Sequence, residues 1–259
     1  MLPNTRPSDR HVQSFARGLQ VIRSFSAAHS AQTLSEVAAR TGLTRAGARR
    51  ILLTLEGLGY VQADGRQFRL TPKILDLGFA YLSSQPLWHT AEPAMQRLAT
   101  AVQESCSLAV LDGAEIVYLL RVPARKIMSI NLGVGSRLPA ACTSMGRMLL
   151  AGLPVGERRA LLGTDPLPAR TPHTLTDPQA VLTAIDQAAQ QGWCLVADEL
   201  EVGLTSLAAP ITDRHGRITA ALNISTASAG SPQHQAHRRL IDEALPQLLR
   251  AVQEISGLV

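Results

Sequence analysis

Cysteine is scarce in this chain, with 3 among 259 residues. Cys106, Cys142 and Cys194 stand far apart, are odd in number and form no C-x-x-C motif. This spacing argues against a disulfide framework or a cysteine-rich zinc site and indicates reduced thiols. Long apolar runs are missing too: none reaches the ~18 residues of a membrane-spanning helix, and the opening residues MLPNTRPSDRHVQ contain no signal-peptide core. We therefore expect a cytoplasmic protein with no membrane partner.

The motifs of several enzyme classes are also absent. The sequence contains no P-loop, no H-E-x-x-H and no G-x-S-x-G, and Gly133-x-Gly135 lacks the third glycine and the βαβ context of a dinucleotide site. Only His234 and His237 have a spacing that a metal could use, and they fall on a charged terminal helix where solvated side chains are the usual case. The acidic run at 198–201 is more typical of a charged loop, a helix cap or an arginine partner than of catalysis. We expect no catalytic residue, no metal and no cofactor.

Positive charge is confined to one part of the chain. Apolar residues make up 46% and charged residues 17% of the sequence, enough for a sizeable core, and the net charge is +5. Residues 1–72 hold ten arginines and four acidic residues, a net charge of +6, whereas the remainder holds fifteen basic and sixteen acidic residues, a net charge of −1. This asymmetry indicates one module that faces a polyanion.

The stretch 33–70 has the pattern of a winged helix-turn-helix. Thr33 and Glu36 form a capping box at the start of a short helix, and Gly42 stands where a tight turn needs a residue that tolerates a positive φ. Thr44 then caps a second helix. The apolar stripe of that helix is expected to consist of Ala48, Ile51, Leu52, Leu55 and Leu58.

Arginines occupy the faces that such a module presents to DNA. Arg45, Ala46, Arg49 and Arg50 lie on the exposed N-terminal turns of the second helix, the part that enters a major groove. A β-hairpin with its turn at Asp64-Gly65 follows, and its Arg66 and Arg69 are placed to contact phosphates as a wing. A helical hairpin with a solvated basic face is the simpler alternative; the adjoining β-hairpin favours binding to double-stranded DNA.

The flanking segments complete this organisation. Residues 14–27 have helical apolar spacing and are expected to be the first helix of the module. An apolar stripe at Ile74, Leu77, Gly78, Tyr81 and Leu82 predicts a linker helix that packs on a partner subunit. We expect a flexible N-terminus at 1–12, a DNA-binding domain at 13–72, a linker helix at 73–86 and an effector-binding and oligomerisation domain at 87–259.

The last of these domains is predicted to be α+β. A helix at 87–104 precedes a hairpin of strands 107–111 and 115–122, a third strand at 127–131 and a helix from Ser144 to Ala151. Asp177 caps another helix, a second hairpin joins 206–211 to 218–225, and a helix at 233–255 is kinked or divided at Pro246. Hairpins at both ends favour one antiparallel sheet with helices on its faces, as in sensor domains.

This domain offers one candidate pocket. Ser144 and the N–H groups of its helix form a possible anion site, and Asn223 and Ser225 point to the same face of one strand, next to Ser206. The apolar walls are expected from Ile127, Ile130, Leu138, Met145 and Leu204. The alternative is that all of these residues are ordinary core and strand-end contacts.

Several ordered motifs make the chain resemble the isocitrate-lyase-regulator (IclR) family of bacterial transcription regulators. They are FARGLQVIRSF, LSEVAARTGLTRAGARRILLTLEGLGYV, FRLTPKILDLGFAYL, GSRLPAACTSMGRMLLA and DELEVGLTSLAAPITDRHGRITAALNIS. LTRAGARRILLTLE and CTSMGRMLLA resemble the branch that controls protocatechuate, 4-hydroxybenzoate and β-ketoadipate catabolism. The resemblance implies an N-terminal winged helix-turn-helix, with Arg17 and Thr44 among its DNA contacts, a linker helix and a GAF-like C-terminal sensor domain. It also implies a homodimer or homotetramer.

The resemblance implies the same effector pocket, with departures from the family pattern. Val196 stands at a position that is often acidic, Ser206 replaces a frequent cysteine, and Asn223 replaces the first of a frequent serine pair. A less acidic pocket speaks against a ligand as small as glyoxylate or pyruvate.

We therefore expect a DNA-binding regulator of aromatic-acid catabolism that responds to a small aromatic or unsaturated carboxylate. The alternatives are a regulator of a different small carboxylate, a DNA-binding architectural protein without a ligand, and a thiol reductase built on the sensor domain. The last needs a low-pKa cysteine beside a base or a helix N-terminus, and no His, Lys or Arg adjoins any of the three in sequence.

Overall fold

The computed structural model describes residues 11–84, 86–124, 132–227 and 237–257, which form two compact units. One unit runs to Ser84 and the other begins at Gln85, and each is described here by itself. The expected flexible N-terminus therefore lies almost wholly outside the described residues, as does the strand expected at 127–131.

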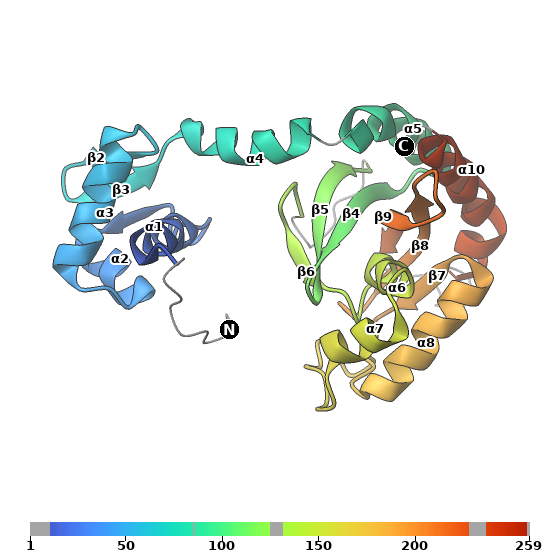
Figure 1. Cartoon of the computed structure of the whole chain (residues 1–259). Helices are drawn as coiled ribbons and strands as arrows, with labels where there is room; N and C mark the ends of the chain where they lie inside the picture. Colours follow the sequence, from blue (N-terminus) through green and yellow to red (C-terminus); the bar gives the residue numbers. More distant parts are fainter. Residues whose placement is uncertain (1–10, 85, 125–131, 228–236, 258–259) are drawn as a thin grey trace. The chain divides into compact units, whose positions relative to one another are not determined.

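The N-terminal unit is the predicted winged helix-turn-helix. Its helices are α1 (Gln13–Arg23), α2 (Leu34–Thr41) and α3 (Arg45–Gly57). Strands β1 (Ala31–Thr33), β2 (Val61–Asp64) and β3 (Gln67–Leu70) form an antiparallel sheet in the order β1-β3-β2 (Figure 1). One small core joins helices and sheet, and its fully or nearly buried members are Val21, Val37, Ala38, Ala48, Leu52, Leu55 and Val61.

Local hydrogen bonds fix the helix boundaries of this unit. The Thr33 hydroxyl accepts from the Glu36 N–H while the Glu36 carboxylate accepts from the Thr33 N–H at 2.7 Å, so the predicted capping box is confirmed. Gly42 ends α2 with φ 66°, and the Thr44 hydroxyl accepts from the Gly47 N–H at 3.1 Å to start α3. Both assignments are confirmed.

Three details of this unit differ from the sequence prediction. Helix α1 ends at Arg23 rather than Ala27, and Phe15 on its outer face is 67% exposed. Leu58 lies beyond the end of α3 and is 54% exposed, so it is not part of the inward stripe. Strand β1 was not predicted, since three residues are too few to show an alternation.

A short helix follows the wing. A single 3-10 turn (Pro72–Ile74) leads into α4 (Leu75–Ser83), which has the predicted position but contains no buried residue. Leu75, Leu77, Phe79 and Tyr81 are each about half exposed or more. This apolar helix is thus uncovered by the described residues of its own unit.

The C-terminal unit is built on a six-stranded antiparallel sheet in the order β6-β5-β4-β9-β8-β7 (Figure 1). The strands are β4 (Ser105–Asp112), β5 (Glu115–Val122), β6 (Arg137–Pro139), β7 (Cys194–Ala197), β8 (Leu204–Thr212) and β9 (Ile218–Ala227). Both predicted hairpins are present as β4–β5 and β8–β9. The short edge strands β6 and β7 were not predicted.

Helices cover both faces of this sheet. On one face lie α6 (Ser144–Ala151), α7 (Val155–Leu162) and α8 (Pro178–Gln191), whose apolar side chains share a core with Ala109, Ala208 and Ala221 of the strands. On the other lie α5 (Pro86–Val102) and α10 (Leu245–Ser256), which pack on each other and on the sheet. The α+β sensor architecture predicted from the sequence is confirmed, although α7 was missed.

Two helix predictions in this unit need adjustment. The N-cap of α6 is Thr143, whose hydroxyl accepts from the Gly146 N–H at 3.2 Å, and Ser144 is the first helical residue. The terminal helix is described only from residue 237 and is interrupted by a π-helical turn (Leu240–Ala244) directly before Pro246. This break is where the proline predicted a division, because proline cannot donate the helical N–H bond.

Gly146 allows α6 to lie directly on the segment that precedes it. A Cβ atom at this position would lie 2.2 Å from the Ala140 carbonyl oxygen. We expect Gly146→Ala to lower the free energy of unfolding by about 1–3 kcal/mol, because a backbone atom must move to make room. Gly156→Ala in α7 is the control, since its Cβ would meet nothing within 4 Å. Urea unfolding measures both, and equal stability of the two variants would contradict the close approach.

Candidate functional site

The predicted DNA-contacting side chains all lie on the surface of the N-terminal unit. Arg45, Ala46, Arg49 and Arg50 are exposed along the first half of α3, and Thr44 caps that helix. Arg66 lies in the β2–β3 turn, Arg69 on β3 and Arg17 on α1, and all three are exposed. None of the ion pairs found among the described residues involves these six arginines. Their charges are therefore not neutralised within the described chain.

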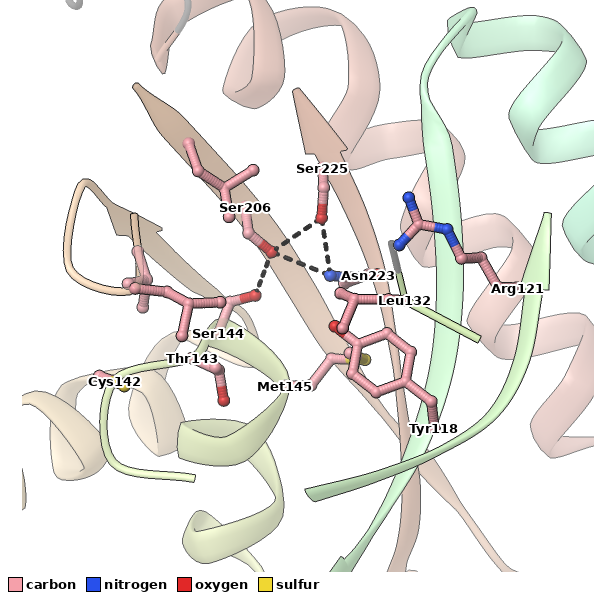
Figure 2. A pocket seen from close by; sticks show the side chains of 13 residues that line it. Tyr118, Arg121, Leu132, Cys142, Thr143, Ser144, Met145, Ser206, Asn223 and Ser225 are labelled. Atoms are coloured by element: carbon pink, nitrogen blue, oxygen red, sulfur yellow. Dashed lines mark hydrogen bonds between the residues drawn. The ribbon is translucent and has the colours of Figure 1, made fainter. Parts of the chain in front are cut away.

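A polar cluster marks a cavity in the C-terminal unit, between α6 and the sheet (Figure 2). Ser206 of β8 and Ser225 of β9 are direct cross-strand partners, and Asn223 lies two residues before Ser225 on the same strand. Ser144, at the start of α6, closes on this group with its hydroxyl 2.6 Å from that of Ser206. Four polar side chains from three elements thus form one network.

The side-chain amide of Asn223 determines which groups of this network donate hydrogen bonds and which accept them. The Ser107 N–H donates to Asn223 Oδ1 at 3.0 Å, so the NH₂ group of Asn223 faces the hydroxyls and donates to Ser206 and Ser225. Ser225 also donates to Ser206, which then accepts twice. A hydroxyl has two lone pairs and one proton, so Ser206 gives its proton to Ser144. The Ser144 proton remains for a ligand.

The wall opposite this network comes from β5. Tyr118 and Arg121 line the cavity from that strand (Figure 2), and Arg121 is the one charged side chain among the described residues that line it. Burial raises the pKa of Tyr118 to about 12, against the opposing effect of Arg121, so the phenol stays neutral. A half-buried guanidinium facing a hydroxyl cluster across apolar side chains fits a small anion with a second polar group.

The structure brings together six of the nine residues proposed for the pocket. Ser144, Met145, Leu204, Ser206, Asn223 and Ser225 line the cavity. Leu138 does not, because β6 pairs it with Ile116 at the edge of the sheet and it packs on the hydrophobic core instead. Ile127 and Ile130 lie outside the described residues.

Sequence reasoning did not propose the remaining lining residues. They are Tyr118, Arg121, Leu132, Cys142, Thr143, Val196 and Leu200. Val196 was noted only as a departure from an acidic family position. An arginine after the mostly apolar run 116–120 of β5 was the available signal for Arg121, because a half-buried charge needs a reason.

The cavity is narrow. Its volume is about 30 Å³, whereas a cavity of about 150 Å³ is known to hold benzene. A ring-bearing ligand therefore needs the walls to move apart. Two of these walls are α6, which carries Ser144 and Met145, and the loop at 198–203, which carries Leu200.

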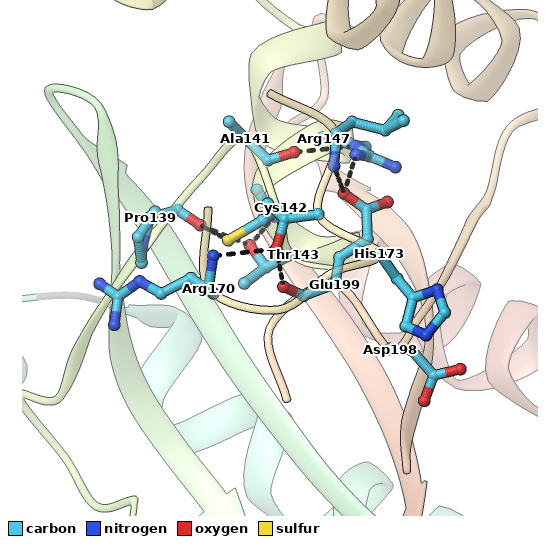
Figure 3. Close-up of polar contacts among 12 residues, drawn as sticks. Pro139, Ala141, Cys142, Thr143, Arg147, Arg170, His173, Asp198 and Glu199 are labelled. Atoms are coloured by element: carbon cyan, nitrogen blue, oxygen red, sulfur yellow. Dashed lines mark hydrogen bonds and ion pairs between the residues drawn. The ribbon is translucent and has the colours of Figure 1, made fainter. Parts of the chain in front are cut away.

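A buried ion pair ties these two walls together. The Arg147 guanidinium on α6 donates to the Glu199 carboxylate at 2.7 Å, and both side chains are less than a tenth exposed. Arg147 also donates to the Ala141 carbonyl at 2.9 Å, and Glu199 accepts from the Leu175 N–H at 3.1 Å (Figure 3). The interpretation of the acidic run as an arginine partner is confirmed for Glu199.

The three cysteines lack the environment of a reactive thiol. All are buried. Burial raises the pKa of Cys106 to about 12, with a further contribution from Glu104, and that of Cys194 to about 11. Burial also raises the pKa of Cys142. A thiol reductase needs the opposite shift, so these pKa values disfavour that alternative.

The described residues also bear on metal binding and membrane insertion. No group of three or more His, Cys, Asp or Glu side chains in that part of the chain is placed to hold a metal ion. None of the helices described is long and apolar enough to cross a membrane.

Comparison with protein families gives two matches that together span most of the chain. Residues 14–65 match the IclR helix-turn-helix domain, and residues 79–257 match the bacterial transcriptional regulator IclR C-terminal domain. Among curated proteins, the Pca regulon regulatory protein of Pseudomonas putida is 43% identical over 93% of this chain and 82% of its own length. The p-hydroxybenzoate hydroxylase transcriptional activator of Acinetobacter baylyi is 33% identical over 97% of this chain and 93% of its own length.

Two solved structures are also similar to this chain over most of its length. A transcriptional regulator from Rhodococcus sp. RHA1 is 45% identical with a TM-score of 0.84, covering 96% of this chain and 98% of that one. An IclR homologue from Microbacterium hydrocarbonoxydans, complexed with 4-hydroxybenzoate, is 27% identical with a TM-score of 0.81, covering 95% of this chain and 98% of that one.

The buried ion pair makes a testable contribution to stability. We expect Glu199→Gln to lower the free energy of unfolding by about 3–5 kcal/mol, because Arg147 would be left charged and unpaired in the interior. Glu254→Gln is the control: its pair with Arg97 is at least half exposed, so about 1 kcal/mol or less is expected. Urea denaturation measures both, and similar losses would mean that the buried pair does not hold the walls together.

Proposed function

Because this chain belongs to the IclR family of bacterial transcriptional regulators, we propose that it controls genes of aromatic-acid catabolism in response to a small aromatic or unsaturated carboxylate. The observation that carries the proposal is the cavity between α6 and the sheet, where Arg121 faces a network of hydroxyls across an apolar interior. The names of the relatives support the same class of target genes. A regulator of bacterial transcription acts on DNA, and we therefore propose a cytoplasmic location.

The proposed ligand lies with its carboxylate on Arg121 and its ring between Met145 and Leu204. This differs from the sequence expectation that the carboxylate binds at the start of α6. Thr143 already accepts one of the N–H groups there, and the end of a helix offers only a partial charge. A guanidinium offers a full charge and two parallel donors. The Ser144 proton then remains for a ring hydroxyl or a second carboxylate.

Two substitutions test this orientation. Arg121→Gln is expected to weaken effector binding by about 1.5–3 kcal/mol, because it removes a charge-assisted hydrogen bond. Ser144→Ala is expected to cost about 1 kcal/mol, the usual value for a neutral donor. Calorimetry with protocatechuate, 4-hydroxybenzoate and β-ketoadipate measures the dissociation constants. Arg217→Gln, in the exposed β8–β9 turn, is the control and should bind as wild type.

Two results would count against this proposal. Unchanged binding by both variants would place the effector elsewhere in the unit. No binding of any of the three acids by the wild type would remove the aromatic-acid assignment and favour a DNA-binding protein without such a ligand.

DNA binding is proposed to depend on the exposed arginines of α3. The triple variant Arg45/Arg49/Arg50→Ala should lose specific affinity, by about 1–3 kcal/mol for each arginine that contacts a guanine in two places. Arg66→Ala and Arg69→Ala in the wing should weaken binding to operator and scrambled DNA alike and reduce the salt dependence. Fluorescence anisotropy at two salt concentrations distinguishes these effects. Arg250→Ala, exposed on α10, is the control. A folded triple variant with wild-type affinity would refute the assignment.

We propose that the N-terminal unit associates with a second copy of itself, because several of its apolar side chains are exposed. Leu75 is 69% and Phe79 63% exposed on α4, and Phe15 is 67% exposed on α1. A helix of this composition is covered in most proteins. Two copies would also present two recognition helices to DNA, at a spacing of about one helical turn or a multiple of it.

This association has a direct test. The wild type is expected to be at least a dimer by light scattering at micromolar concentration, and Leu75→Glu with Phe79→Glu should weaken the dimer because two charges would be buried in it. Val155→Glu, at an exposed apolar site on α7, is the control. A monomeric wild type that binds a half-site tightly would exclude the proposal.

A further inference from the structure

A second, larger cavity adjoins the first and shares Cys142 with it. It lies between α6, α7 and the loop at 163–177, and its volume is about 230 Å³. Its lining includes five leucines: Leu150, Leu161, Leu162, Leu167 and Leu175. The proposed effector site does not use this space.

The volume and lining of this cavity suit a hydrocarbon ring. A cavity of about 150 Å³ lined by aliphatic side chains binds benzene, and this one is larger and has the same kind of wall. Enclosure by leucines stabilises a ring roughly in proportion to the apolar area removed from water. A single aromatic or aliphatic ring therefore fits here without any displacement of the first cavity's walls.

Arg170 provides a positive charge at the rim of this cavity. Arg170 is exposed, and its guanidinium takes part in none of the ion pairs found among the described residues. Arg170 is itself among the residues that line the cavity. An exposed arginine beside an apolar cavity is placed to bind a carboxylate.

The one carboxylate in the lining does not cancel this charge. Glu115 accepts a hydrogen bond from the Arg137 guanidinium at 2.8 Å, and Arg137 also binds the Asp112 carboxylate at 2.7 Å. Glu115 thus has its own cationic partner on β6, which it shares with Asp112. The cation that remains for a ligand anion is Arg170.

The cavity offers little to a ring hydroxyl. The Thr174 hydroxyl donates to the Glu199 carbonyl at 2.7 Å and accepts from the N–H groups of Arg170 and Thr171, so its hydrogen-bonding capacity is used. These bonds also fasten the loop that carries Arg170 to the chain beside the buried Arg147–Glu199 pair (Figure 3). The charge is held on a fixed loop.

We propose that this second cavity binds a small apolar monocarboxylate such as benzoate, with its ring among the leucines and its carboxylate on Arg170. The ligand class differs from that of the first cavity, where a hydroxyl network selects a second polar group. Since Cys142 borders both cavities, the two ligands bind on opposite sides of one short segment.

Calorimetric titration of the full-length Arg121→Gln protein with benzoate tests this site, because that background removes the cation of the first cavity. Benzoate is expected to bind it as it binds the wild type. Adding Arg170→Gln should weaken binding about ten-fold or more, through the loss of a charge-assisted contact. Leu161→Trp should weaken it by filling the cavity. Arg159→Gln, an exposed arginine on α7 outside the lining, is the matched control and should change nothing.

The outcomes separate this proposal from that for the first cavity. Absence of benzoate binding in the Arg121→Gln background would overturn it, as would wild-type affinity after Arg170→Gln. Arg170 is exposed, so its substitution does not depend on refolding of the core, whereas Leu161→Trp checks the cavity itself. Binding of 4-hydroxybenzoate in the Arg170→Gln protein should be retained, and its loss there together with benzoate would also overturn the assignment of two separate sites.

Discussion

The buried ion pair between Arg147 and Glu199 is the contact on which the rest of the sensor unit depends. Two charges taken out of water are costly, and their attraction offsets the cost only when further hydrogen bonds satisfy both groups. The Ala141 carbonyl and the Leu175 N–H supply those bonds. One interaction thereby joins α6, the segment before it, the loop at 163–177 and the loop at 198–203. Together these elements line the two cavities.

The polar network of the first cavity and this ion pair have different effects. The ion pair fixes the position of α6, and the network fixes which hydrogen-bonding group of α6 faces the cavity. Because the Ser107 N–H fixes the amide of Asn223, each hydroxyl after it has a defined role as donor or acceptor, and bonds in such a chain strengthen one another. Asn223 thus has a physical consequence for the site: it gives the network a direction.

Features set by neighbouring residues were predictable from the sequence, and features set by sheet order were not. The capping box at Thr33, the turn at Gly42 and the β8–β9 hairpin each depend on a few consecutive residues, and all are present. Tyr118 and Arg121 reach the cavity only because β5 lies two strands from β9, an arrangement no local pattern encodes. Leu138 was wrongly assigned to the pocket, because its edge strand is only three residues long and was not predicted. Ser144 was found because it begins a helix, which is a local feature.

A first cavity of about 30 Å³ also sets a kinetic condition on the effector proposed for it. Under that proposal an aromatic ring enters only a conformation in which the cavity is wider, so the rate of association is limited by how often that conformation occurs. The apparent dissociation constant equals the intrinsic constant divided by the population of that conformation. A population of about 1% therefore weakens binding about a hundred-fold. Such a regulator has a lower affinity for its effector but discriminates better between ligands. A weakly bound metabolite does not stabilise the wider conformation, whereas a ligand that contacts both walls does.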